Sequence, residues 1–144
     1  MNLEQVMDQL ETQERFGKNI THWEVIPEKP GEYEAFPEYL NSKLVSALKK
    51  RGIYRLYSHQ RKALDEVTSN NNNITVVTPT ASGKSLCYNL PVLNALLADK
   101  NARAIYLFPT KALSQDQVSE LMDMVDEMGE DIKTFTYDGD TPVN

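Results

Sequence analysis

The segment Thr78-Pro79-Thr80-Ala81-Ser82-Gly83-Lys84-Ser85 decides how the rest of the sequence is interpreted. It follows Ile74-Thr75-Val76-Val77, a β-branched run that is typical of a buried strand. It leads into residues 84–98, whose leucines recur at helical spacing. Its last three residues match the pattern G-x-x-x-x-G-K-[S/T], but Thr78 stands where that pattern has its first glycine. The segment therefore predicts a phosphate-binding turn between a strand and a helix.

Each part of this turn has a physical reason. A sharp turn brings successive backbone N–H groups to one point, and the helix that follows adds its positive dipole end. Gly83 lets the backbone approach a phosphate without a Cβ, Lys84 can reach the β- and γ-phosphates, and the Ser85 hydroxyl can ligate Mg²⁺. We therefore assign catalytic roles to Lys84 and Ser85, and the metal contact to Ser85. The predicted nucleotide-binding set in this turn is Thr80, Ala81, Ser82, Gly83, Lys84 and Ser85. The plain alternative is a strand–helix turn with an incidental lysine.

Two more strands and a helix are predicted downstream. Residues 104–108 and 134–137 have the composition of strands, and residues 112–128 have apolar side chains at helical spacing. The order strand, helix, strand, helix, strand predicts an α/β fold with right-handed crossovers and a parallel sheet. Few residues follow the third strand, so we expect the sheet to be partial.

The residues upstream are predicted to be mainly helical. The expected helices cover 3–16, a stretch opened by Pro37 and ended at Gly52, and 58–69. This pattern divides the chain into an N-terminal helix and linker, residues 1–36, and the first part of the phosphate-loop domain, residues 37–144.

Composition excludes several classes of protein. The 144 residues are 40% hydrophobic, which is enough for one core. No apolar run reaches 18 residues, so no membrane span is expected. Cys87 is the single cysteine, which excludes an internal disulfide and favours a reducing, cytoplasmic location. The net charge of −6 argues against nucleic-acid binding through the overall charge of the chain. Residues 36–100, however, carry 9 basic and 4 acidic side chains, and this local excess of positive charge is compatible with a phosphate site.

The phosphate segment resembles motif I of superfamily 2 helicases of the DEAD/DEAH-box type, in which the first glycine is commonly replaced. Leu56-Tyr57-Ser58-His59-Gln60 is similar to their Q motif. This resemblance implies a RecA-like fold, ATP with Mg²⁺ as the cofactor, and adenine recognition by Gln60, whose amide can both donate and accept. Tyr57 either stacks on the adenine or packs within the protein.

A second resemblance lies downstream. Leu107 to Gln117 resembles motif Ia, which implies contacts with the sugar–phosphate backbone of a nucleic-acid strand. The segment Thr136-Tyr137-Asp138-Gly139-Asp140-Thr141 resembles that of MrfA-like bacterial helicases linked to DNA repair. The nucleic-acid-binding residues implied are Pro109, Thr110, Lys111, Gln115 and Gly139. A helix N-terminus, a hydroxyl and an ammonium all suit phosphate, although Thr110 can also act as a plain helix cap.

The resemblance implies an ATP-dependent helicase, with DNA favoured over RNA as its partner. The two Asp-Glu pairs, Asp65-Glu66 and Asp126-Glu127, are predicted to lie on helices and so do not supply the Mg²⁺-binding acid of motif II. We therefore expect the chain to be the N-terminal part of a helicase that is inactive without its C-terminal portion. Two alternatives stay open: a small P-loop kinase with Asp138 as its Mg²⁺-binding acid, and a non-catalytic nucleotide-binding interaction module that recruits a partner through residues 1–36.

Overall fold

The computed structural model describes residues 2–139 and 141 of the 144-residue chain. The chain divides into two units, Met1–Pro30 and Gly31–Asn144. This division lies upstream of the domain boundary predicted after residue 36, which stays a prediction.

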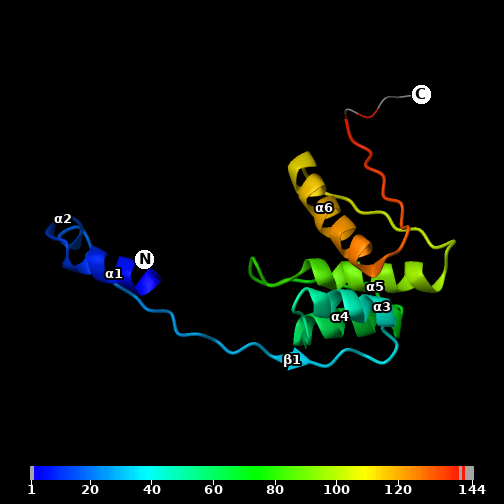
Figure 1. Cartoon of the computed structure of the whole chain (residues 1–144), viewed down its shortest axis with the longest axis horizontal. Coiled ribbons are helices and arrows are strands. Elements are labelled where there is room, and N and C mark those ends of the chain that lie inside the picture. Colours follow the sequence, from blue (N-terminus) through cyan, green and yellow to red (C-terminus); the bar gives the residue numbers. More distant parts are fainter. Residues whose placement is uncertain (1, 140, 142–144) are drawn as a thin grey trace. The chain divides into compact units, whose positions relative to one another are not determined.

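The first unit contains two short helices, α1 (Leu3–Thr12) and α2 (Glu14–Gly17), instead of the single helix predicted over 3–16 (Figure 1). The break lies at Gln13, whose ψ of 116° is extended. Asn2 caps α1, because its side chain accepts a hydrogen bond from the Gln5 backbone N–H at 2.9 Å. No described residue of either helix is buried, so this unit has no core of its own.

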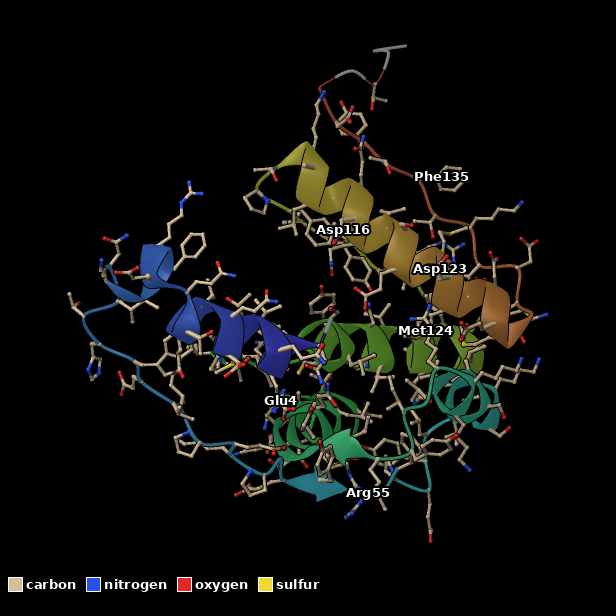
Figure 2. The ribbon with its side chains drawn as sticks, turned by 60° about the vertical axis from the view of Figure 1, so that its left-hand side comes forward. Glu4, Arg55, Asp116, Asp123, Met124 and Phe135 are labelled. Atoms are coloured by element: carbon tan, nitrogen blue, oxygen red, sulfur yellow. The ribbon has the colours of Figure 1, made fainter. Side chains whose placement is uncertain are left out.

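Four helices form the packed part of the second unit: α3 (Ser42–Lys50), α4 (Ser58–Thr68), α5 (Ser85–Ala98) and α6 (Lys111–Met128). Helix α4 packs on α5, and α3 packs on both α6 and α5. Figure 2 shows Met124 between α6 and α5. The fully buried side chains of this core include Leu44, Leu48, Leu56, Leu64, Leu90, Leu93 and Met124.

Local signals predicted three of these helices well. The ranges 58–69, 84–98 and 112–128 differ from the observed helices by one residue at an end. Thr110 caps α6, since its hydroxyl accepts from the Leu113 N–H at 3.3 Å, and Gly129 ends the helix with φ of +68°.

The predicted start of the helix at Pro37 is wrong. Residues 37–40 form a turn, closed by a 3.1 Å hydrogen bond from Leu40 N–H to Pro37 C=O, and α3 begins at Ser42. Asn41 is the cap: its side chain accepts from Lys43 N–H at 2.9 Å, and its own N–H donates to Asn94 of α5 at 2.9 Å. The helix therefore begins where a cap and a tertiary contact coincide. Its end at Gly52, with φ of +78°, agrees with the prediction.

The predicted parallel sheet differs most from the structure. Among the described residues, the one sheet pairs β1 (Tyr33–Glu34) with β2 (Leu56–Tyr57) in antiparallel register. Residues 74–77, 104–108 and 134–137 have no strand partner in that part of the chain. Their apolar side chains are largely exposed, including Val77 (88%) and Leu107 (89%). Figure 2 shows Phe135 standing away from the helices. Local composition favours an extended chain, but pairing depends on a neighbouring strand that local composition does not specify.

No helix among the described residues is both long and apolar enough to cross a membrane.

Candidate phosphate site and the segments around it

The phosphate loop has an unusual backbone. Ala81 and Gly83 both have positive φ, +60° and +72°, while Lys84 is right-handed with φ of −56°. Left-handed residues next to right-handed ones form the nests of N–H groups that bind anions. Across the described chain, the backbone N–H groups of residues 80, 81, 83 and 84 donate to no protein group, and Ser82 closes a turn that begins at Pro79. They are available as a set of donors for a phosphate.

Helix α4 holds the opposite, carbonyl side of this loop. The Nε2 atom of His59 is 3.0 Å from the Ser82 carbonyl oxygen, and Gln60 Nε2 donates to the Gly83 carbonyl at 2.8 Å. Gln60 is buried, and its Oε1 accepts from the Tyr57 N–H at 2.9 Å. Two neighbouring side chains thus fix two neighbouring carbonyls of the loop.

These two contacts between α4 and the phosphate loop, here called the α4 latch, were not predicted from the sequence. His59 and Gln60 each lie 23 residues before the carbonyl that they contact. The adenine role predicted for Gln60 is untested by this geometry. Its amide keeps one further N–H and one further lone pair after making the two bonds.

Lys84 folds back over the loop. Its ammonium donates to the carbonyls of Thr78 at 2.9 Å and Pro79 at 2.7 Å. The Thr78 hydroxyl is 2.6 Å from the Ser82 hydroxyl, so the residue that replaces the first glycine closes the loop through its side chain. A cation and the free N–H donors therefore lie in the same turn.

An aromatic row stands at the start of α4. The Tyr57 ring stacks on Tyr33, with centroids 4.8 Å apart, and on His59, with centroids 5.6 Å apart. The Arg55 guanidinium lies 5.9 Å from the Tyr33 ring centroid. Tyr57 thus already has two aromatic neighbours, and its stacking on adenine stays a prediction.

Ser85 is the first residue of α5, and Tyr88 lies one helical turn further along the same helix. Burial raises the pKa of Tyr88. The Tyr88 hydroxyl donates to Gln117 Oε1 on α6. Tyr88 therefore joins α5 to the part of α6 that belongs to the segment resembling motif Ia.

The candidate nucleic-acid segment lies at the start of α6. Pro109, Thr110, Lys111 and Gln115 are exposed there. The Lys111 ammonium is 4.0 Å from a carboxylate oxygen of Asp138. Asp138 begins a turn in which its N–H donates to the Thr141 hydroxyl at 2.9 Å, and Gly139 belongs to this turn. The structure therefore brings Lys111 close to the segment of Gly139.

Both Asp-Glu pairs lie on helices, as predicted. Asp65, on α4, accepts from Arg61 Nε at 2.9 Å, and Glu127, on α6, accepts from Arg51 Nε at 3.0 Å. The described residues contain no group of three or more His, Cys, Asp or Glu side chains that could hold a metal ion.

Comparison with known proteins identifies related sequences. Residues 57–144 match the family model of the DEAD/DEAH box helicases. An uncharacterized ATP-dependent helicase of Bacillus subtilis (strain 168), YprA, is 52% identical over 124 residues, which are 86% of this chain and 16% of that protein. The ATP-dependent helicase hrq1 of Schizosaccharomyces pombe is 39% identical over 120 residues, 81% of this chain and 11% of that protein. The chain thus spans less than a fifth of these relatives.

A solved structure matches almost the whole chain. The crystal structure of the DUF1998 helicase MrfA bound to DNA and AMPPNP superimposes with a TM-score of 0.84 and 48% identity. The match covers 99% of this chain and 19% of that one.

Proposed function

Because the chain belongs to the DEAD/DEAH box helicase family, we propose that it supplies part of the ATP-binding RecA-like domain of an ATP-dependent DNA helicase. The likeness to MrfA, whose solved structure contains DNA and the ATP analogue AMPPNP, supports both the nucleotide and the DNA. Helicase activity would belong to the whole protein rather than to residues 1–144 alone.

The phosphate loop is the observation that carries this proposal. Its backbone N–H groups at residues 80, 81, 83 and 84 have no acceptor in the described chain, and Lys84 lies in the same turn. Lys84 now donates to two neutral carbonyls; exchanging them for phosphate oxygens gives stronger, charge-assisted bonds. His59 and Gln60 keep the loop carbonyls turned toward α4 throughout.

Ser85 is the residue we propose for Mg²⁺. Mg²⁺ prefers oxygen ligands and is commonly held by substrate phosphates, waters and only one or two protein groups. A single hydroxyl at the N-terminus of α5 fits that arrangement, with the ion arriving together with ATP. When bound, MgATP supplies the phosphoryl group whose transfer to water drives the motor.

We assign backbone contacts with one DNA strand to the start of α6 and the turn around Gly139. Lys111 faces Asp138 at 4.0 Å, and its side chain is 46% exposed. Such an exposed ion pair contributes little to stability, so the ammonium can exchange Asp138 for a phosphate at low cost. The same pairing gives the kinase alternative little support, because that reading needs Asp138 as a ligand of Mg²⁺.

We also propose that residues 74–77, 104–108 and 134–137 form neighbouring parts of a parallel sheet in the whole protein. Their exposed apolar side chains support this, since strands of parallel sheets are normally covered on both faces.

The phosphate site is tested by replacing its lysine. We expect Lys84→Ala to weaken binding of a fluorescent, non-hydrolysable ATP analogue with Mg²⁺ by about 10- to 100-fold, the value of one charge-assisted hydrogen bond. Lys100→Ala, which removes an exposed lysine after α5, is the control and should bind as the unmodified chain does. Equal affinities in the two variants would remove the phosphate site from the proposal.

A further inference from the structure

Residue 81 of the phosphate loop is held in a conformation that alanine does not favour. The φ of Ala81 is +60°, in the left-handed region, where the Cβ of an L-residue crowds the following carbonyl oxygen. The other left-handed residue of the loop, Gly83, has no Cβ and is free of this strain. Both residues shape the nest of N–H donors. Contacts outside the backbone of Ala81 must therefore keep it in place.

Two side-chain contacts fix the chain on either side of Ala81. The Thr78 hydroxyl lies 2.6 Å from the Ser82 hydroxyl, so one hydrogen bond closes the loop from residue 78 to residue 82. On the far side of the loop, His59 of α4 contacts the Ser82 carbonyl oxygen at 3.0 Å. Between these fixed ends, the ring of Pro79 locks one φ. Few conformations are left for the two residues that follow it.

Lys84 adds a second support, which a bound phosphate would remove. Its ammonium donates to the carbonyl oxygens of Thr78 and Pro79 at 2.9 and 2.7 Å, and it lies 3.5 Å from the Ser82 hydroxyl oxygen. Under the proposed function, Lys84 exchanges these carbonyls for phosphate oxygens. The Thr78–Ser82 bond then has to keep the two ends of the loop together without Lys84. Losing this bond therefore destabilises the phosphate-bound loop more than the free loop, and the difference appears in the affinity for phosphate.

We propose that Thr78 is a positioning residue for the phosphate groups of the nucleotide, and that its hydroxyl compensates for the alanine at position 81. This inference rests on the proposed function. Thr78 stands where the pattern G-x-x-x-x-G-K-[S/T] has its first glycine, so the departure from the pattern supplies the bond that the strained loop needs. Thr78 and Ala81 thus depend on each other.

The test removes the hydroxyl and keeps the shape of the side chain, in Thr78→Val. We expect the affinity for a fluorescent, non-hydrolysable ATP analogue with Mg²⁺ to fall about fivefold, the value of one neutral hydrogen bond. Thr78→Ser keeps a hydroxyl and should retain most of the affinity. Thr78→Gly restores the glycine of the pattern, but it should bind no more tightly than Thr78→Val. Thr75→Val makes the same exchange at an exposed position before the loop and is the control.

A second background tests the link with Ala81. In Ala81→Gly the left-handed conformation no longer carries a Cβ, so the loop depends less on the hydroxyl bond. Adding Thr78→Val to Ala81→Gly should therefore weaken binding about twofold or less, compared with about fivefold in the chain that has alanine. The losses from Thr78→Val and Ser82→Ala should also not add, because each change removes the same bond. Urea denaturation of every variant checks that it folds.

The outcomes are distinguishable. Undiminished affinity in Thr78→Val, the same loss in Thr78→Ser or in the control, or tighter binding by Thr78→Gly than by the unmodified chain would each overturn the inference and leave the proposed function standing. An equal loss in the alanine and glycine backgrounds would overturn the link with Ala81. If Thr78→Val does not fold, Thr78→Gly and Ser82→Ala decide in its place. If the unmodified chain binds no nucleotide, the proposed function fails and the inference fails with it.

Discussion

Gly83 shapes the phosphate loop and also makes room for the Gln60 side chain. Its positive φ shapes the nest of N–H donors, and its lack of a Cβ leaves room for Gln60. A Cβ built there would lie 2.5 Å from Gln60 Nε2, which is held by hydrogen bonds at both ends of its amide. Moving the Gln60 amide away from such a Cβ would therefore break at least one of its two hydrogen bonds.

A matched pair of glycine variants measures this contact. Gly83→Ala and Gly129→Ala both place an alanine at positive φ, at a cost of roughly 1–2 kcal/mol, but a Cβ added at Gly129 would meet no atom within 4 Å. We expect Gly83→Ala to lower the free energy of unfolding by about 1 kcal/mol more than Gly129→Ala, and to weaken nucleotide binding about tenfold. Urea denaturation and nucleotide titration measure the two effects; equal results for both variants would contradict the role assigned to the Gln60 contact.

Tyr106 makes stability depend on alkaline pH. Burial raises its pKa from the ordinary value of 10.0 to about 12. Between these values the unfolded chain loses the phenolic proton and the folded chain keeps it, so the folded state loses stability as pH rises. We expect the free energy of unfolding to decline over this interval, and to decline less in Tyr106→Phe. Urea denaturation at several pH values checks this, and an equally steep decline in the variant would exclude Tyr106 as a contributor.

At the scale of elements, local signals predicted three helices of the second unit, α4, α5 and α6, but not the contacts that these helices make with one another. Helix α6 was predictable because Thr110, Gly129 and the spacing of its apolar residues all belong to one continuous stretch of sequence. The start of α3 was not, because Pro37 and Asn41 are both start signals, and the contact that favours Asn41 comes from Asn94 on another helix. The phosphate loop was recognised from its own residues, whereas the latch from α4 and the bridge from Tyr88 to Gln117 join segments that are far apart in sequence.

The observed start of α3 can be checked by two substitutions. Asn41→Ala removes a cap and should lower the free energy of unfolding by about 1 kcal/mol. Pro37→Ala alters only the preceding turn and should cost clearly less. Denaturation followed by circular dichroism measures both, and a larger effect at Pro37 would favour a helix that starts there.

At the scale of the whole molecule, charged groups of α3 join the C-terminal end of α6 within the second unit. Arg51 pairs with Glu127 at 3.0 Å, and Lys50 donates to the Glu127 carbonyl at 3.1 Å. Lys43 pairs with Glu130 beyond the end of α6. The basic end of α3 therefore meets the carbonyl end of α6, where cations are favourable.

The unpaired segments predict self-association. Val77 and Leu107 lie on extended stretches with no strand partner among the described residues, and such edges pair with other chains. We expect the weight-average mass of the 144-residue chain to rise with concentration in sedimentation equilibrium. Val77→Lys with Leu107→Lys should reduce this rise, while Val25→Lys, at an exposed site of the first unit, should not. A chain that stays monomeric at all concentrations would contradict the expectation.

The hydrogen bonds of His59 and Gln60 to the loop carbonyls also bear on the order in which the chain folds. Among the described residues, the Ser82 carbonyl is held by His59 of α4, while the Gly83 carbonyl accepts from Gln60 of α4 and, at 3.3 Å, from the Leu86 N–H of α5. The two contacts with α4 each close 23 residues of chain. Closing such a loop costs entropy that packing between α4 and α5 must offset. We therefore expect the loop to bind phosphate only after α4 and α5 have packed together during folding, and not as soon as the local turn forms. The rate at which a fluorescent nucleotide becomes bound during refolding would then report the rate at which the two helices pack together.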